Sequence, residues 1–137
     1  MWWIYALLSA LFAALTTIFA KIGITGVNSN LATAIRTIVI LIVAWCIVIV
    51  RGEAKGLPLL SKQNVLFLVI SGIATGLSWI FYFKALQIGK VAQVASVDKL
   101  SIALTIILAM IFLNEALTVK TAIGAVLIIS GTIIMIL

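Results

Sequence analysis

Long apolar runs, separated by short polar segments, make up nearly the whole of this sequence. A helix needs about 20 mostly apolar residues to cross a bilayer, because the hydrocarbon core is about 30 Å thick. Five runs reach that length: residues 2–20, 31–50, 65–86, 91–113 and 119–137. The pattern predicts an all-α integral membrane protein, a single domain of five transmembrane helices joined by short loops.

Side chains suited to capping helices stand in the polar segments. Asn30 ends KIGITGVNSN, Ser61 lies within RGEAKGLPLLSKQN, and Thr118 ends NEALT. Such side chains accept a hydrogen bond from a free backbone N–H in the first turn of a helix. We therefore expect these three residues to cap the second, third and fifth helices.

The composition excludes several classes of protein. The 137 residues are 66% hydrophobic, with nine basic and three acidic side chains and a mean hydropathy of +1.43, so a soluble domain is not expected. There is no His and only one cysteine, Cys46, so we expect no disulfide, metal site or cofactor. Without a carboxylate pair at helical spacing or a basic run, neither an enzyme nor a nucleic-acid-binding protein is expected.

The basic residues are divided almost evenly between the two ends of the predicted helices. The side of the N-terminus carries four and the other side two, or four if side chains that snorkel to the surface are included. The four on the N-terminal side are Arg51, Lys55, Lys62 and Lys120. The two on the other side are Lys21 and Lys90, and the two that can snorkel there are Lys84 and Arg36. This bias weakly places the N-terminal side in the cytoplasm. It also permits insertion in both orientations, so that the chain pairs with its own inverted copy.

Two charged residues, Asp98 and Lys99, interrupt the fourth apolar run. A charge at the centre of a spanning helix costs about 2.5 to 3.5 kcal/mol, so this helix would insert only marginally by itself. It needs neighbouring helices or a hydrated cavity. Successive helical residues point about 100° apart, so Asp98 and Lys99 should not face one another. We expect Asp98 to share a polar face with Ser101 and Thr105, and Lys99 to lie on a separate face of small residues.

A polar stripe also runs along the third helix. Thr75, Ser78 and Tyr82 share one face, and Trp79 lies on the face beside it. Measured from the turn near residue 88, Ser78 and Asp98 each lie about ten residues away, or roughly 15 Å along a helix. That depth is the middle of the bilayer. The two antiparallel helices are therefore predicted to present a carboxylate, hydroxyls and an indole at one level.

Arg36 in the second helix is the expected counter-ion of Asp98, because a guanidinium can hold a carboxylate through two hydrogen bonds. With Lys99 included, the membrane interior holds about one spare positive charge. This suits a small-molecule substrate that bears a carboxylate or a phosphate. A structural alternative stays open: the three charges can serve only as a salt-bridge network, and hydroxyl or small-residue stripes more often pack helices than line a substrate path.

The end of the chain resembles a known transporter repeat. In ILAMIFLNEALTVKTAIGAVLIISGTIIMIL an apolar helix is followed by a glutamate-containing loop and a last helix with two glycines. The residues of this motif are Phe112, Leu113, Glu115, Leu117, Thr118, Gly124 and Gly131. Together with YFKALQIGKVAQVASVDKLS, it resembles the EamA-type repeat of the drug/metabolite transporter superfamily over nearly the whole chain.

Two positions depart from that family's pattern. Many members have Gly where Asn114 stands, a mild change because Asn also tolerates a left-handed turn. Many have a proline near Ile102 in the fourth helix. This chain has none, so nothing in the sequence predicts a kink there.

The resemblance implies a secondary transporter of ten helices, built from two inverted five-helix repeats around a midplane site. This chain supplies one repeat. We therefore expect a dual-topology, antiparallel homodimer that moves a small metabolite by alternating access across a bacterial or archaeal cytoplasmic membrane. The alternative is an accessory subunit, or a subunit of a flippase for lipid-linked substrates, that works with a different membrane partner.

The expected substrate and coupling site consists of residues from the second, third and fourth predicted helices. Asp98 is the coupling or gating carboxylate, and Arg36 and Lys99 bind substrate or supply counter-charge. The other members expected to contact the substrate are Thr75, Ser78, Trp79, Tyr82 and Ser101.

Overall fold

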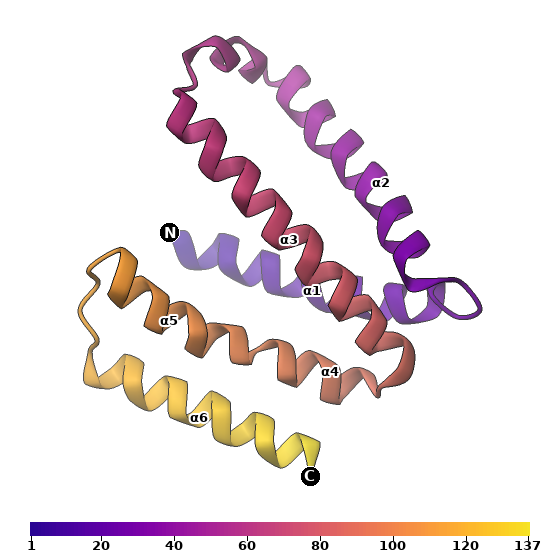
Figure 1. Cartoon of the computed structure of the whole chain (residues 1–137), viewed down its shortest axis with the longest axis vertical. Coiled ribbons are helices and arrows are strands. Elements are labelled where there is room, and N and C mark those ends of the chain that lie inside the picture. Colours follow the sequence, from indigo (N-terminus) through magenta and orange to yellow (C-terminus); the bar gives the residue numbers. More distant parts are fainter. The chain divides into compact units, whose positions relative to one another are not determined.

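The computed structural model describes all residues, 1–137, and every regular element in it is helical. The elements are, in chain order, α1 (Trp2–Gly23), α2 (Ser29–Val50), the 3-10 helix η1 (Glu53–Leu59), α3 (Lys62–Ile88), α4 (Val91–Asp98), α5 (Leu100–Phe112) and α6 (Val119–Ile136) (Figure 1). Five segments are long and apolar enough to cross a membrane, with α4 and α5 together forming one of them. The predicted all-α membrane fold with five transmembrane helices is confirmed.

Two of the three predicted helix caps are confirmed. The Ser61 hydroxyl accepts a hydrogen bond from the Asn64 N–H at 3.1 Å at the start of α3. The Thr118 hydroxyl accepts one from the Thr121 N–H at 3.2 Å at the start of α6. Each cap satisfies a backbone donor that has no partner within its own helix.

The predicted cap of α2 is wrong by two residues. Asn28, not Asn30, caps this helix, because the Asn28 Oδ1 atom accepts from the N–H groups of Asn30 at 2.9 Å and Leu31 at 3.4 Å. Asn28 has the extended backbone that a cap requires, whereas Asn30 already lies in the first turn. Both are asparagines, so the sequence alone offered two capping residues for one helix.

Residues Ala20–Gln87 form one unit of the structure. Its buried side chains gather where the end of α1, the start of α2 and the end of α3 meet, and Phe83 and Leu86 retain only 1% and 0% exposure. The other buried side chains of this cluster are Ala20, Ile24, Ser29 and Thr33. Farther along α2 and α3 the apolar side chains are exposed, as expected of helices that face lipid or further helices.

Two long side chains tie the end of α3 to the segment around the α1–α2 turn. The Lys21 ammonium donates to the carbonyl of Leu86, and the Gln87 side-chain amide donates to the carbonyl of Val27 at 2.5 Å. The last carbonyls of a helix lack intrahelical donors, and a cation also complements the negative end of the helix dipole. Lys21 thus fixes the end of α3 in addition to being a charge near the membrane surface.

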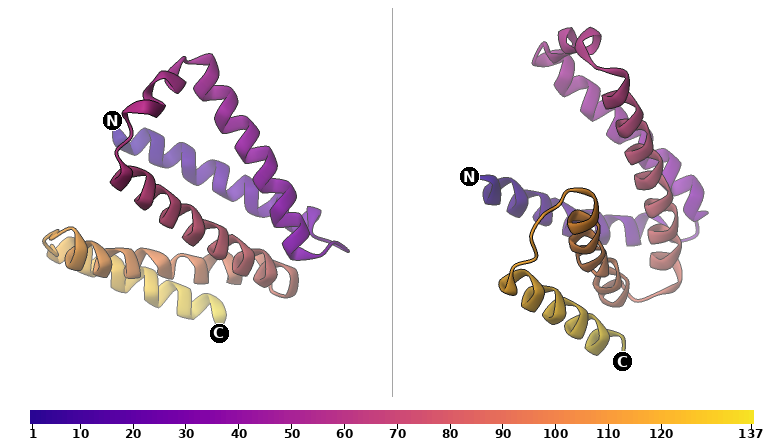
Figure 2. Two further views of the ribbon diagram at one scale, coloured as in Figure 1. Left: turned by 45° about the horizontal axis from the view of Figure 1, so that its top comes forward. Right: turned by 60° about the vertical axis from the view of Figure 1, so that its left-hand side comes forward.

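Residues Met1–Phe19 and Ile88–Leu137 form the other unit. Within it α6 runs back alongside α4 and α5, which Figures 1 and 2 show from three directions. The turn between α5 and α6 requires Asn114 at a φ of 53°, a left-handed conformation that no other non-glycine residue of the chain adopts. The expectation that Asn114 tolerates the conformation of the family's usual glycine is confirmed.

Candidate functional site

Arg36 extends from α2 and lies against two aromatic rings of α3. Its Cζ atom is 4.5 Å from the ring centroid of Phe83 and 5.2 Å from that of Trp79. These aromatic residues are four positions apart and therefore neighbours on one helix face. A guanidinium so placed is attracted by the ring electrons, by about 0.5 to 2 kcal/mol per contact. The sequence predicted Trp79 in the site but not Phe83. The four-residue spacing of Phe83 from Trp79 was the signal that could have identified it.

One nitrogen of the Arg36 guanidinium, Nη1, is buried and has no hydrogen-bond partner. Ring faces attract the charge but offer no lone pair in the plane where the N–H groups point. The hydroxyls of Thr33 and Thr37 on α2 each donate to the carbonyl four residues earlier, both at 2.9 Å, and neither accepts a hydrogen bond from Arg36 Nη1. The guanidinium therefore retains unused capacity to bind an oxyanion.

The predicted fourth helix is not continuous. It divides at Lys99 into α4 and α5, which together still form the predicted spanning segment, Val91–Phe112. At the break the Lys99 N–H bonds to the Ser96 carbonyl at 3.1 Å and the Ile102 N–H to the Lys99 carbonyl at 3.0 Å, both with three-residue spacing. This tight 3-10 geometry interrupts the regular α-helical ladder.

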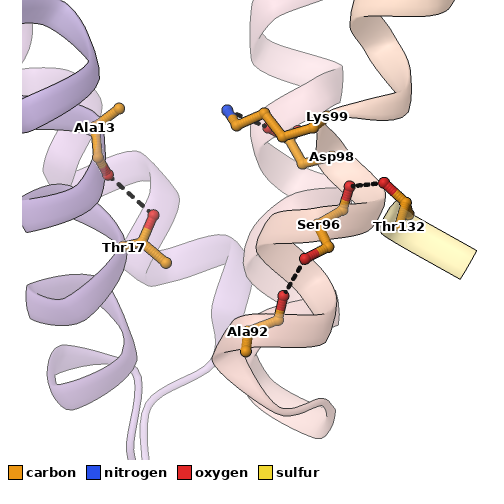
Figure 3. Close-up of polar contacts among 7 residues, drawn as sticks. All are labelled: Ala13, Thr17, Ala92, Ser96, Asp98, Lys99 and Thr132. Atoms are coloured by element: carbon orange, nitrogen blue, oxygen red, sulfur yellow. Dashed lines mark hydrogen bonds and ion pairs between the residues drawn. The ribbon is translucent and has the colours of Figure 1, made fainter. Parts of the chain in front are cut away.

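At the break a hydroxyl of a neighbouring helix bonds to the backbone, and no proline is present. Thr132 of α6, 4% exposed, donates to the Ser96 carbonyl at 3.1 Å, and the Ser96 hydroxyl donates to the Ala92 carbonyl at 2.7 Å (Figure 3). A side chain that enters the backbone ladder is a recognised cause of helix kinks, and serine back-bonding also bends helices. Thr132, a polar residue in the largely apolar α6, was the available sequence signal for this contact.

Asp98 and Lys99 are in contact, contrary to the sequence-based expectation. The Lys99 Nζ atom lies 3.4 Å from the Asp98 Oδ2 atom (Figure 3). Adjacent residues diverge on a regular helix, but the helix ends here and the long lysine side chain folds back to reach the carboxylate. The two charges therefore neutralise each other locally, with both side chains still partly exposed.

The hydroxyl stripes are only partly free for a ligand. Thr75 donates to the Ser71 carbonyl at 2.9 Å, and Thr105 to the Ser101 carbonyl at 2.8 Å, so each threonine hydroxyl already donates its hydrogen within its own helix. Ser78 is exposed on α3 and makes no side-chain hydrogen bond. The best available hydroxyl of the third-helix stripe is therefore Ser78.

The predicted site residues belong to the two units of the structure. Arg36, Thr75, Ser78, Trp79 and Tyr82 lie in the unit of residues 20–87, where Arg36 contacts Trp79 and the ring of Tyr82 meets that of Phe83 edge to face at 6.1 Å. Asp98, Lys99 and Ser101 lie in the other unit, where the first two form an ion pair. The pairing of Arg36 with Asp98 and their common depth stay predictions.

The sequence matches the EamA-like transporter family over residues 1–137. This chain belongs to the EamA-like transporter family. The resemblance found in the loop motif is thereby confirmed, and the protein is a multi-pass integral membrane protein of the transporter class.

Two curated relatives cover almost the same length as this EamA-like transporter. One is an "uncharacterized transporter in cobO 3′ region" of Sinorhizobium sp, 45% identical over 98% of this chain and 95% of the relative. The other, an uncharacterized protein of Methanocaldococcus jannaschii, is 30% identical over 96% of this chain and 93% of the relative. No solved structure matches the EamA-like chain.

Proposed function

We propose that this EamA-like chain is a secondary transporter of a small metabolite and works as an antiparallel homodimer. The observation that carries the proposal is the number of helices: five spanning segments in one chain, with relatives of nearly the same length. Transporters with inverted repeats build their substrate site between two such repeats. Two copies in opposite orientations would supply both.

The glycines of the spanning helices support a close partner. A methyl group added at Gly72 or Gly76 of α3, or at Gly124 or Gly131 of α6, would meet no atom within 4 Å. Small residues allow helix backbones to approach closely in membranes, where packing replaces the hydrophobic effect as the driving force. These open glycine faces are available to a second copy, and the nearly even charge distribution lets that copy insert upside down.

The break at Lys99 supports alternating access. Eight residues of α4 and thirteen of α5 correspond to about 12 Å and 20 Å of helix, so the break lies well inside the membrane. Discontinuous helices line substrate sites in transporters of this architecture, and an interrupted ladder bends more easily than a continuous one. In this scheme Asp98, at the end of α4, is the coupling carboxylate, and release of Lys99 accompanies the change of orientation.

The test is the orientation of the chain in the membrane. In a Cys46→Ser background, Thr25→Cys and Lys55→Cys place a thiol in the segments on opposite sides. We expect a membrane-impermeant maleimide added to intact cells to label about half of each population, because both orientations are inserted. Complete labelling of one position and full protection of the other would show a single orientation, which refutes the antiparallel homodimer and favours a different membrane partner.

A further inference from the structure

Arg36 is the charged residue of the spanning helices that has a buried hydrogen-bond donor without an acceptor. Its guanidinium is covered by Phe83 and Trp79, and its buried Nη1 atom has no acceptor. A guanidinium has five N–H donors and keeps its charge at all relevant pH values. The aromatic rings hold the group in one place, which pre-organises it for a planar acceptor.

The guanidinium is placed too deep to bind lipid headgroups readily. Arg36 lies seven residues after Ser29, where α2 begins, or about 10 Å along the helix. Its two aromatic contacts, Phe83 and Trp79, lie five and nine residues before the end of α3, or about 8 and 14 Å. The Arg36 guanidinium is thus held between the depths of Phe83 and Trp79 instead of extending to the membrane surface.

The charge of the ligand follows from the charges already paired. Asp98 and Lys99 form an ion pair, so they supply no net charge. Lys21 donates to a helix-terminal carbonyl, and Lys84 lies four residues from the end of α3. Among the basic residues that lie away from the helix ends, Arg36 is then the one positive charge without a partner acceptor. A monocarboxylate matches it in charge and in planar two-oxygen geometry, whereas a phosphate monoester carries about 1.5 to 2 negative charges.

We propose that Arg36 binds the carboxylate of a small monocarboxylate substrate, whose apolar body lies against Trp79. The inference rests on the proposed transport function and specifies its substrate class. Trp79 is half-buried and Phe83 fully buried, so Trp79 is the ring that retains surface for a ligand. The site needs only residues of α2 and α3, and binding can therefore be measured separately from transport and from dimer orientation.

Trp79 supplies the optical probe. The chain has four tryptophans, and Trp2→Phe, Trp3→Phe and Trp45→Phe leave Trp79 alone. The variant that retains only Trp79 is placed in phosphatidylcholine nanodiscs and titrated with benzoate, hexanoate and lactate. The amides benzamide, hexanamide and lactamide are titrated as their neutral counterparts. We expect at least one carboxylate to change Trp79 fluorescence saturably, with its amide about tenfold weaker or worse. No saturable response to any carboxylate, or equal responses to acid and amide, would overturn the proposal.

The two arginines of the chain provide a matched pair of variants. Arg36→Gln should weaken carboxylate binding about tenfold or more. Arg51→Gln, which loses an exposed ion pair with Glu53, should leave it unchanged. Arg36→Lys keeps the charge but loses the planar fork, and we expect about threefold weaker binding with the preference for acid over amide retained. The Arg36→Lys variant also tests the contact if Arg36→Gln does not fold. Parent-like affinity in either Arg36 variant would refute the contact.

Two further arms identify competing oxyanions. If carboxylate affinity falls in proportion to added phosphatidylglycerol, a lipid phosphodiester occupies Arg36, and the proposal is overturned. If Asp98→Asn by itself strengthens carboxylate binding about tenfold, Asp98 is the resident acceptor and the substrate role is again overturned. Mixed orientation without carboxylate binding would defeat this inference alone. Binding in a chain of single orientation would support it and defeat only the homodimer.

Discussion

The hydroxyl of Thr132 offers the sharpest test of how the broken helix is held. Thr132→Val keeps the shape of the side chain but removes its donor to the Ser96 carbonyl, a bond of 3.1 Å from a residue that is 4% exposed. The carbonyl keeps its bond from the Lys99 N–H, so it is not left without a partner. Only the link between α4 and α6 is lost.

The expected loss of stability can be estimated from other hydrogen bonds between membrane helices. A hydrogen bond between membrane helices contributes about 0.6 kcal/mol on average and at most about 1.7. Because this one is buried and joins two helices where the α-helical ladder is interrupted, we expect Thr132→Val to lower the free energy of unfolding by about 0.5 to 1.5 kcal/mol. The equilibrium constant for unfolding would then rise about 2-fold to 12-fold.

The assay is equilibrium unfolding in mixed detergent micelles, with helix content followed by circular dichroism. Thr105→Val is the matched control, since the Thr105 hydroxyl is exposed and donates to a carbonyl of its own helix at 2.8 Å. We expect it to change stability by less than about 0.5 kcal/mol. Equal effects of the two substitutions, or none from Thr132→Val, would refute the claim that Thr132 holds the break.

Two other predictions concern transport and folding. In proteoliposomes, Asp98→Asn should reduce gradient-driven uptake of the tightest-binding carboxylate about tenfold or more, while Glu115→Gln in the α5–α6 loop should retain it; full uptake by Asp98→Asn would exclude a coupling role. Asn28→Ala should destabilise the protein by about 1 kcal/mol in the same unfolding assay, because it removes the cap of α2. Asn30→Ala should cost less than about 0.5 kcal/mol, and the reverse order would contradict the cap assignment.

Much of the fold was determined by the sequence without reference to tertiary contacts. The lengths of the apolar runs require five spanning helices, because the bilayer leaves no other way to satisfy the backbone. Ser61 and Thr118 were identifiable as caps because each is a suitable side chain in the polar segment that precedes an apolar run. Asn114 likewise indicated a position that tolerates a left-handed turn, which its φ of 53° confirms.

The candidate site divides between what the sequence could and could not determine. That Arg36, Asp98 and Lys99 need partners follows from the energy of placing charges in a membrane. Which partners they have depends on distances between separate helices. The contact of Arg36 with Phe83 and Trp79 required α2 and α3 to lie together, and the Asp98–Lys99 ion pair required the helix to end between them.

The position of the break could not be read from helix propensity. No proline or glycine stands near Lys99, so local preference favours a continuous helix. Where the structure interrupts it, a hydroxyl from α6, 36 residues away in the chain, bonds to the Ser96 carbonyl. Sequence periodicity describes each helix separately, whereas a bond between helices depends on their relative rotation and depth. The sequence therefore determined where the membrane helices lie, and their packing determined where one of them breaks.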